Sequence, residues 1–147
     1  MPQPAAPAPV DPRGPRFNQA VIAVLLVVGF LLDWEPVVPA VAVILGLGAA
    51  FGPRFGLFLT LYARAVRPRL GPPAQLEDPR PPRFAATLGT VVLSAATVAF
   101  LAGAQVVGWG LALLVALLAA LSASTGICVG CEIYLFLARR RGIRMAG

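Results

Sequence analysis

The sequence contains no histidine and no lysine, and only 12% of its 147 residues are charged. The absence of histidine removes the commonest general base and the commonest metal ligand of proteins. The absence of lysine excludes Schiff-base chemistry on a side-chain amine. Soluble globular domains carry about twice this share of charged residues. The composition therefore points away from soluble enzymes and toward the membrane.

What the sequence has instead is hydrophobic residues, which make up 59% of the chain and gather in four runs separated by short polar breaks. A helix that spans a bilayer needs roughly 20 mostly apolar residues. We therefore predict an all-α membrane protein with four transmembrane helices, at about residues 17–34, 37–52, 84–105 and 109–127. A Pro/Ala-rich tail at residues 1–10, expected to be disordered, precedes them, and a Pro-rich connection at residues 71–77 divides them into two pairs.

Glycines mark the ends of the second and fourth runs. A helix continued from the second run through Gly52 to Val66 would be about 45 Å long, more than the roughly 30 Å of a bilayer core. We therefore expect a break near Gly52, and then a short helix along the membrane interface at about residues 54–66. The corresponding break at Gly126 is expected to precede a second interfacial helix, at about residues 128–141.

The chain also contains an internal repeat. Residues 11–17 (DPRGPRF) recur as residues 78–84 (DPRPPRF), with six identities in seven. Further along, Leu61-Tyr62 is echoed by Ile133-Tyr134. Two spans return a chain to the side where it started, so the halves should run parallel about an axis normal to the membrane. The predicted repeats are residues 11–70 and 78–147.

All twelve basic residues are arginines, and they stand at the ends of the hydrophobic runs. Eleven belong to the N-terminal tail, the central connection or the C-terminus, whereas the turn at residues 33–36 carries two acids and no arginine. Because cytoplasmic loops are enriched in arginine, we expect a protein of the cell (inner) membrane with both termini and the central connection in the cytoplasm. This placement also explains the net charge of +6 without a nucleic-acid partner.

The arginines of the repeated motif allow two interpretations. Aspartate and proline suit the start of a helix, and arginine side chains reach from there to lipid headgroups. The alternative is a specific site for an anionic lipid headgroup or for a protein partner. The arginines of that candidate site are Arg13, Arg16, Arg80, Arg83 and Arg139.

The only two cysteines, Cys128 and Cys131, lie three positions apart, where the last hydrophobic run gives way to arginines. On a helix this spacing is within reach of a disulfide bond. If Ser124 or Thr125 caps a new helix after the break, Cys128 lies in its first turn, where free N–H groups favour the thiolate. We therefore assign the catalytic roles of attacking sulfur to Cys128 and of resolving sulfur to Cys131. Glu132 is a candidate for proton exchange with Cys128, although a nearby carboxylate also disfavours the thiolate.

Other roles for the cysteines stay open. Cysteine also packs well as a small apolar residue in helices. Structural zinc needs four ligands, which two thiolates without histidine do not supply, so we predict no metal and no cofactor. On the repeat alignment, Gly56 and Leu59 stand where the second half has its cysteines. The pair belongs to one half only, which favours a task beyond the scaffold.

The opening at residues 11–19 and the Cys-x-Gly-Cys-x-x-Tyr motif at residues 128–134 resemble the bacterial family of domain of unknown function 4395. The resemblance implies an integral membrane protein without an established activity, whose relatives occur near thioredoxin-like or rhodanese-like proteins. It favours a thiol-disulfide or sulfur-relay component that exchanges with a soluble thioredoxin-like or sulfurtransferase-like partner.

The alternative function is a non-catalytic membrane subunit or a small transporter with structural cysteines, and a homo-oligomer stays open in either case. None of the four runs carries an acid or a base well inside it. Charges inside a membrane usually mark ion and proton pathways, so their absence argues against such a pathway here.

Overall fold

The computed structural model describes residues 13–51, 60–72 and 80–142, and these residues form helices and turns without any strand. The all-α prediction is therefore confirmed for this part of the chain, whereas the tail at residues 1–10 lies outside it. The elements are α1 (Arg13–Leu31), α2 (Val37–Phe51), the π-helical η2 (Tyr62–Val66), α4 (Arg67–Leu70), α5 (Arg80–Leu101), α6 (Gln105–Thr125) and α7 (Val129–Arg140).

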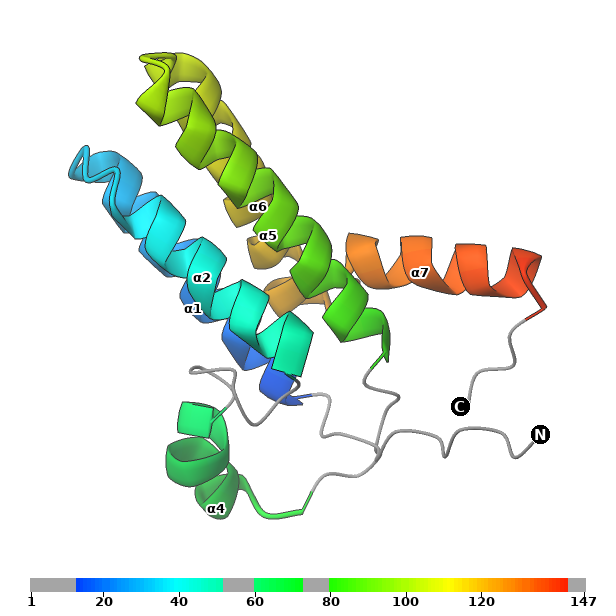
Figure 1. Cartoon of the computed structure of the whole chain (residues 1–147). Coiled ribbons are helices and arrows are strands. Elements are labelled where there is room, and N and C mark those ends of the chain that lie inside the picture. Colours follow the sequence, from blue (N-terminus) through cyan, green and yellow to red (C-terminus); the bar gives the residue numbers. More distant parts are fainter. Residues whose placement is uncertain (1–12, 52–59, 73–79, 143–147) are drawn as a thin grey trace.

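Four of these helices form a bundle of two hairpins (Figure 1). Residues 32–36 join α1 to α2, residues 102–104 join α5 to α6, and both turns lie at the same end of the bundle. α2 packs against α5 and α1 packs against α6, so each helix of the first hairpin contacts one helix of the second. α5 and α6 also pack along one another, which makes the second hairpin the tighter of the two.

Three helices are long and apolar enough to cross a membrane, namely α1, α5 and α6, with 19, 22 and 21 residues. α2 is apolar as well but has 15 residues, which corresponds to about 22 Å at 1.5 Å per residue. A bilayer core is about 30 Å thick. By length and composition, the described residues therefore contain three candidate spans where the sequence predicted four.

α1 and α5 begin at Arg13 and Arg80, four residues before the predicted starts of their spans at residues 17 and 84. The difference arises because the prediction began each helix at its first large apolar residue. Proline is tolerated in the first turn of a helix, where its missing N–H would have had no partner in the helix. The described residues of the repeated motif, 13–17 and 80–84, thus form the first turn of each helix.

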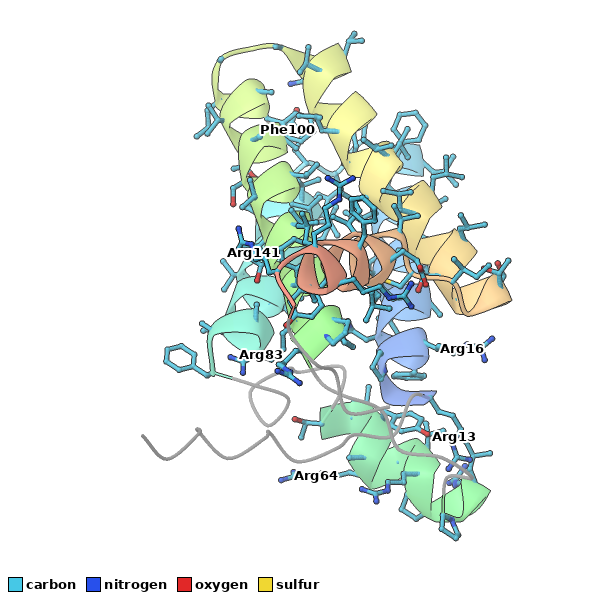
Figure 2. All side chains as sticks on the ribbon, turned by 90° about the vertical axis from the view of Figure 1, so that its right-hand side faces the viewer. Arg13, Arg16, Arg64, Arg83, Phe100 and Arg141 are labelled. Atoms are coloured by element: carbon cyan, nitrogen blue, oxygen red, sulfur yellow. The ribbon has the colours of Figure 1, made fainter. Side chains whose placement is uncertain are left out.

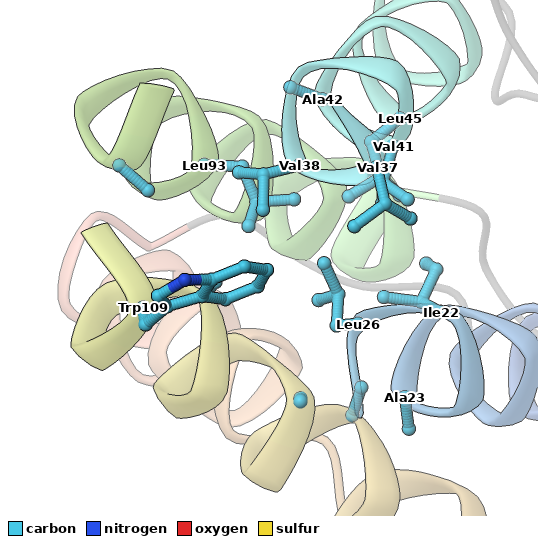
Figure 3. Packing of buried hydrophobic residues seen from close by; sticks show 14 of the residues in the cluster. Ile22, Ala23, Leu26, Val37, Val38, Val41, Ala42, Leu45, Leu93 and Trp109 are labelled. Atoms are coloured by element: carbon cyan, nitrogen blue, oxygen red, sulfur yellow. The ribbon is translucent and has the colours of Figure 1, made fainter. Parts of the chain in front are cut away.

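The core of the bundle is a cluster of branched aliphatic side chains between the four long helices (Figure 3). Ile22 and Leu26 of α1, Val38 of α2 and Leu93 of α5 are each at most 1% exposed. Trp109 of α6 extends this cluster toward the turns. Its ring meets those of Phe30 and Phe100 edge to face, with ring centroids 5.5 Å and 5.1 Å apart.

The outside of the bundle is apolar as well. Large side chains that are at least 60% exposed occur on all four helices; examples are Val24, Val43, Val91, Val98 and Leu117. Soluble monomers rarely expose contiguous apolar surface of this kind, whereas lipid tails are as apolar as leucine. The exterior therefore fits a protein whose long helices are surrounded by hydrocarbon.

Two further helical segments lie away from the bundle at the end where α1 and α5 begin (Figure 1). α7 extends sideways from the bundle where α5 begins and α6 ends. Its range of Val129–Arg140 lies close to the predicted one of 128–141. In the first half, the chain is helical from Thr60 to the end of α4 at Leu70. The predicted helix at residues 54–66 is described only from Thr60 onward, and helical structure continues past Val66 to Leu70.

Candidate thiol site at the start of α7

The cysteines follow a sharp change of chain direction at Gly126. This glycine is the C-cap of α6 and has a φ of +78°, a left-handed conformation that glycine adopts without strain. Its N–H donates to the carbonyl oxygen of Ser122. The Thr125 hydroxyl donates to the carbonyl of Leu121 at 2.6 Å and accepts the N–H of Ile127 at 3.2 Å. These bonds end α6 and let the chain leave at an angle.

Cys128 is the N-cap of α7. Its backbone is extended, with φ −94° and ψ 116°, and its sulfur accepts the N–H of Cys131 at 3.4 Å. A side chain that accepts from the third residue of a helix satisfies one of the free N–H groups at its start. The predicted cap at Ser124 or Thr125 is therefore wrong, because two non-helical residues separate Gly126 from the helix. The Ser124 hydroxyl instead donates back to the carbonyl of Ala120, within α6.

The helix start favours a charged Cys128 sulfur. The pKa of the Cys128 thiol is lowered from 9.0 to about 6, chiefly by a hydrogen bond from the Cys131 side chain. Burial acts in the opposite direction, and hydrogen bonds from the Cys131 backbone, the Ser122 side chain and the Gly130 backbone add to the lowering. A pKa of about 6 favours the thiolate at neutral pH, and the thiolate is the form that attacks disulfides and binds metals.

Exposure does not separate the two sulfurs. Cys128 and Cys131 are both partly buried, and both are thiols without a disulfide between them. What distinguishes them is the hydrogen-bond direction, since Cys128 receives a bond from the backbone N–H of Cys131. Cys128 is thus the stabilised anion of the pair, and Cys131 supplies the donor.

α7 is held against α5 by close packing at two positions, one between the cysteines and one after them. A β-carbon at Gly130 would lie 2.7 Å from the β-carbon of Ala85, so only glycine allows this approach. One turn further, the rings of Phe84 and Tyr134 meet with their centroids 5.5 Å apart. The residue between the two cysteines is therefore a packing point of α7 on the bundle.

Glu132 lies in the first turn of α7, and its side chain is exposed. Its backbone N–H donates to the carbonyl of Cys128 at 2.9 Å. Among the described residues, no ion pair joins its carboxylate to Arg139 or Arg140. Arg140 instead lies over the ring of Phe136, and Arg139 is exposed. An acid at this position favours the start of the helix through the helix dipole.

Two of the candidate arginines bind the ends of helices in the opposite half of the chain. Arg16 of α1 donates to the carbonyl of Ala123 at 3.2 Å, in the last turn of α6. Arg83 of α5 donates to the carbonyl of Ala49 at 2.9 Å, in the last turn of α2, and to that of Ala50 at 3.3 Å. The last carbonyls of a helix lack partners within it and attract cations. The two arginines are therefore reciprocal links between the halves.

The remaining candidates lie near the same end. Arg13 donates to the carbonyl of Gly71 at 2.9 Å and so connects the start of α1 with the segment after α4. Arg80 is the first residue of α5 and is partly exposed. In Figure 2, Arg13, Arg16 and Arg83 lie toward one end of the molecule and Phe100 toward the other. The structure thus brings Arg16 to the last turn of α6, whereas Arg13 lies beside the segment after α4.

A cavity of about 220 Å³ adjoins Cys128, and sequence reasoning missed it. Most of its lining is apolar and comes from α1, α2, α5, α6 and α7, while Gln19 and Ser122 add polar groups. Neither residue was assigned a role from the sequence, because a polar residue beside an apolar run indicates no particular chemistry. Within the described ranges, no group of three or more cysteines and acids is placed to hold a metal ion.

Comparison with known proteins gives one match. A family model described as "Domain of unknown function (DUF4395)" matches residues 10–139, which include both cysteines and all the described helices except the last residue of α7. No curated protein and no solved structure matches the chain.

Proposed function

The chain belongs to the DUF4395 family, and we propose that it is a multi-pass membrane protein that exchanges disulfide bonds with a soluble partner through Cys128 and Cys131. The family match agrees with the resemblance of the motifs at residues 11–19 and 128–134. The observation that carries the proposal is the position of Cys128 as the cap of α7, where its sulfur accepts the Cys131 N–H and its pKa is about 6.

We further propose four spans in two parallel repeats, with α2 as a short span. Two ring pairs support the repeats. Phe17 and Tyr62 lie 5.6 Å apart at an angle of 41° in the first half, and Phe84 and Tyr134 lie 5.5 Å apart at 48° in the second. These four residues are the ones that the sequence repeat aligns. The bond of Arg16 to α6 and the bond of Arg83 to α2 correspond in the same way, because the sequence repeat aligns Arg16 with Arg83.

The proposed orientation has both termini in the cytoplasm. The described arginines belong to the starts of α1 and α5, to η2 and α4, and to the end of α7 with its C-cap, all at one end of the bundle. The turn at residues 32–36, at the other end, carries Asp33 and Glu35. Arginine-rich segments remain on the cytoplasmic side of a membrane. The start of α7 would then be reached by a cytoplasmic partner.

In the proposed reaction, the Cys128 thiolate attacks one sulfur of a disulfide in the partner. A bond forms between Cys128 and that sulfur, and the other partner sulfur leaves as a thiolate. Cys131 loses its proton to solvent and attacks Cys128, which forms the Cys128–Cys131 disulfide and releases the partner with two reduced thiols. The chain is oxidised by two electrons and the partner is reduced by two, and the reverse sequence oxidises the partner.

The partner proposed is a thioredoxin-like protein, because its paired cysteines undergo the same exchange. A sulfur relay from a sulfurtransferase-like protein would use the same sulfur. There Cys128 attacks the outer sulfur of a partner persulfide, the persulfide moves to Cys128, and the partner leaves as a thiolate. Both reactions need Cys128, whereas only the disulfide exchange needs Cys131 to release the partner.

The competing function is a membrane subunit in which the cysteines serve packing. A specific observation favours it, since Cys128 caps α7 and the intervening Gly130 packs on Ala85. The cap at Cys128 and the packing of Gly130 hold α7 in place without any redox change.

Trapping of mixed disulfides tests the proposal. In native membranes, Cys131→Ser should retain a thioredoxin-like protein on Cys128 through a bond that dithiothreitol releases, because the resolving thiol is gone. Cys128→Ser is the matched control and should retain nothing. If neither variant retains a partner and both cysteines resist alkylation until detergent is added, the packing function replaces the redox one.

A further inference from the structure

The cavity beside Cys128 is open toward the side of the bundle. Leu88 of α5, Leu118 of α6 and Ile133 of α7 line it and are 37%, 37% and 43% exposed. Residues that line a cavity and are also exposed mark its mouth. This mouth lies between α5 and α6, and α7 borders it. Lipid would surround the bundle there, so a ligand dissolved in the bilayer reaches the cavity without crossing water.

The walls of the cavity combine apolar surface with two polar groups. Gln19 of α1 is partly buried and lines the cavity, and its amide can donate to an oxygen of a ligand. Ser122 of α6 is 5% exposed and donates its hydroxyl to the Cys128 sulfur. Small-molecule sites are commonly apolar pockets with a few polar groups of this kind.

We infer that this cavity binds the ring of a membrane quinone, which accepts two electrons from the Cys128–Cys131 pair and so restores its disulfide. The inference rests on the proposed thiol-disulfide function and names its membrane substrate. A quinone is the occupant because two cysteines that share a hydrogen bond give up two electrons when they form a disulfide, and a quinone ring accepts two electrons. The hydrocarbon of an acyl chain, by comparison, would offer no oxygen to Gln19. Attachment of an acyl group to a cysteine would need only one sulfur.

The reaction is balanced without a further reactant. The Cys128 thiolate shares an electron pair in a new bond to a ring carbon, and a π pair of the ring moves to a ring oxygen. Cys131 then attacks the Cys128 sulfur, the disulfide bond forms, and the bond between sulfur and carbon breaks with its electrons left on the ring. The two protons of the thiols, passed through solvent, end on the two ring oxygens. The products are the disulfide and a hydroquinone.

The test uses the purified full chain in detergent, reduced and then freed of reductant under nitrogen. The probe is decylubiquinone, whose fully substituted ring does not form stable adducts with thiols. The decrease in absorbance of its quinone band is compared with the loss of free thiols. The expected result is one quinone reduced for two thiols lost, and no reduction by Cys128→Ser.

Two tryptophan variants separate cavity binding from reaction in solution. Leu118→Trp fills the mouth of the cavity. It should slow quinone reduction by about tenfold, because it weakens quinone binding by about tenfold. Leu117→Trp is the matched control, since residue 117 is 66% exposed, is the next position on α6 and does not line the cavity. It should keep the rate of the unchanged chain.

A second assay distinguishes failure of this inference from failure of the proposed function. Reduced chain is mixed with oxidised thioredoxin, and exchange is followed by thiol loss. Exchange with thioredoxin but no reduction of decylubiquinone, or equal rates for Leu118→Trp and Leu117→Trp, would overturn the quinone inference alone. The absence of exchange with either reagent would overturn both.

Discussion

Gly130 of α7 lies directly against Ala85 of α5. A β-carbon at position 130 would come within 2.7 Å of the Ala85 β-carbon and within 2.9 Å of its α-carbon. Contacts this short are strongly repulsive, so α7 approaches α5 this closely only because residue 130 has no side chain. Because Gly130 stands between the two cysteines, the same contact determines where Cys128 and Cys131 lie relative to the bundle.

Gly130→Ala should therefore displace the start of α7. The added methyl group has no space, and overpacking of this kind costs about 1–3 kcal/mol. We expect a lower melting temperature in detergent and a changed alkylation rate of Cys128. Ala85→Gly in the same chain should restore both only in part, because it removes the β-carbon at 2.7 Å and leaves the α-carbon at 2.9 Å.

Gly110→Ala is the matched control, because nothing lies within 4 Å of a β-carbon at this position in α6. Alanine is also the better helix former, by about 1 kcal/mol. Loss of stability in Gly110→Ala equal to that in Gly130→Ala would show that the close packing of α7 on Ala85 is not the cause.

The two ring pairs predict matched coupling energies. Double-mutant cycles of Phe17 with Tyr62 and of Phe84 with Tyr134, each residue changed to leucine, should give about 0.5–1.5 kcal/mol per pair. The measurement is chemical or thermal unfolding in detergent. Coupling in one pair and none in the other would contradict the proposed equivalence of the halves.

The one-sided arginines predict the topology. A reporter fused at the C-terminus or inserted after Pro72 should be active in the cytoplasm, and one inserted at Glu35 should be active outside. The measurement is a pair of reporters, one active on each side of the membrane. Cytoplasmic activity at Glu35 would contradict the proposed orientation and with it the assignment of a cytoplasmic partner.

Local features of the sequence predicted much of the fold. The all-α class follows from the length of the apolar runs, and the predicted break at Gly126 coincides with the end of α6 because a left-handed glycine is a local signal. The predicted start of α7 at residue 128 is one residue from the observed Val129 for the same reason. The repeated motif was predicted to suit a helix start, and α1 and α5 do begin within it, at Arg13 and Arg80, although the predicted spans began four residues later.

The features that sequence reasoning missed depend on contacts between distant segments. Arg16 and Arg83 were assigned to lipid or to a partner, yet each donates to a helix end in the other half, at Ala123 and Ala49. The cavity beside Cys128 likewise forms only when five helices meet, so no single segment indicates it. The cap at Cys128 was missed because serine and threonine are the commoner caps.

The last prediction concerns the pH dependence of the Cys128 sulfur. Its pKa of about 6 means that the thiol is mostly protonated below pH 6 and mostly thiolate above it. Only the thiolate reacts with iodoacetamide, so in intact membranes the alkylation rate of Cys128 should rise with pH to a midpoint near 6 and change little above pH 7. An ordinary cysteine, with a pKa of about 8.5, would still gain about tenfold in rate between pH 6 and pH 7.

Two variants at position 131 isolate the cause of that shift, and each leaves Cys128 as the one cysteine to be labelled. Cys131→Ser keeps a side-chain donor and should keep the midpoint near 6. Cys131→Ala removes the hydrogen bond that lowers the pKa most, so its midpoint should move upward. Rates are measured by mass spectrometry of the modified peptide between pH 5 and pH 9. A midpoint near that of an ordinary cysteine in Cys131→Ser would mean that the start of α7 does not stabilise the thiolate, and the attacking role of Cys128 would then be lost.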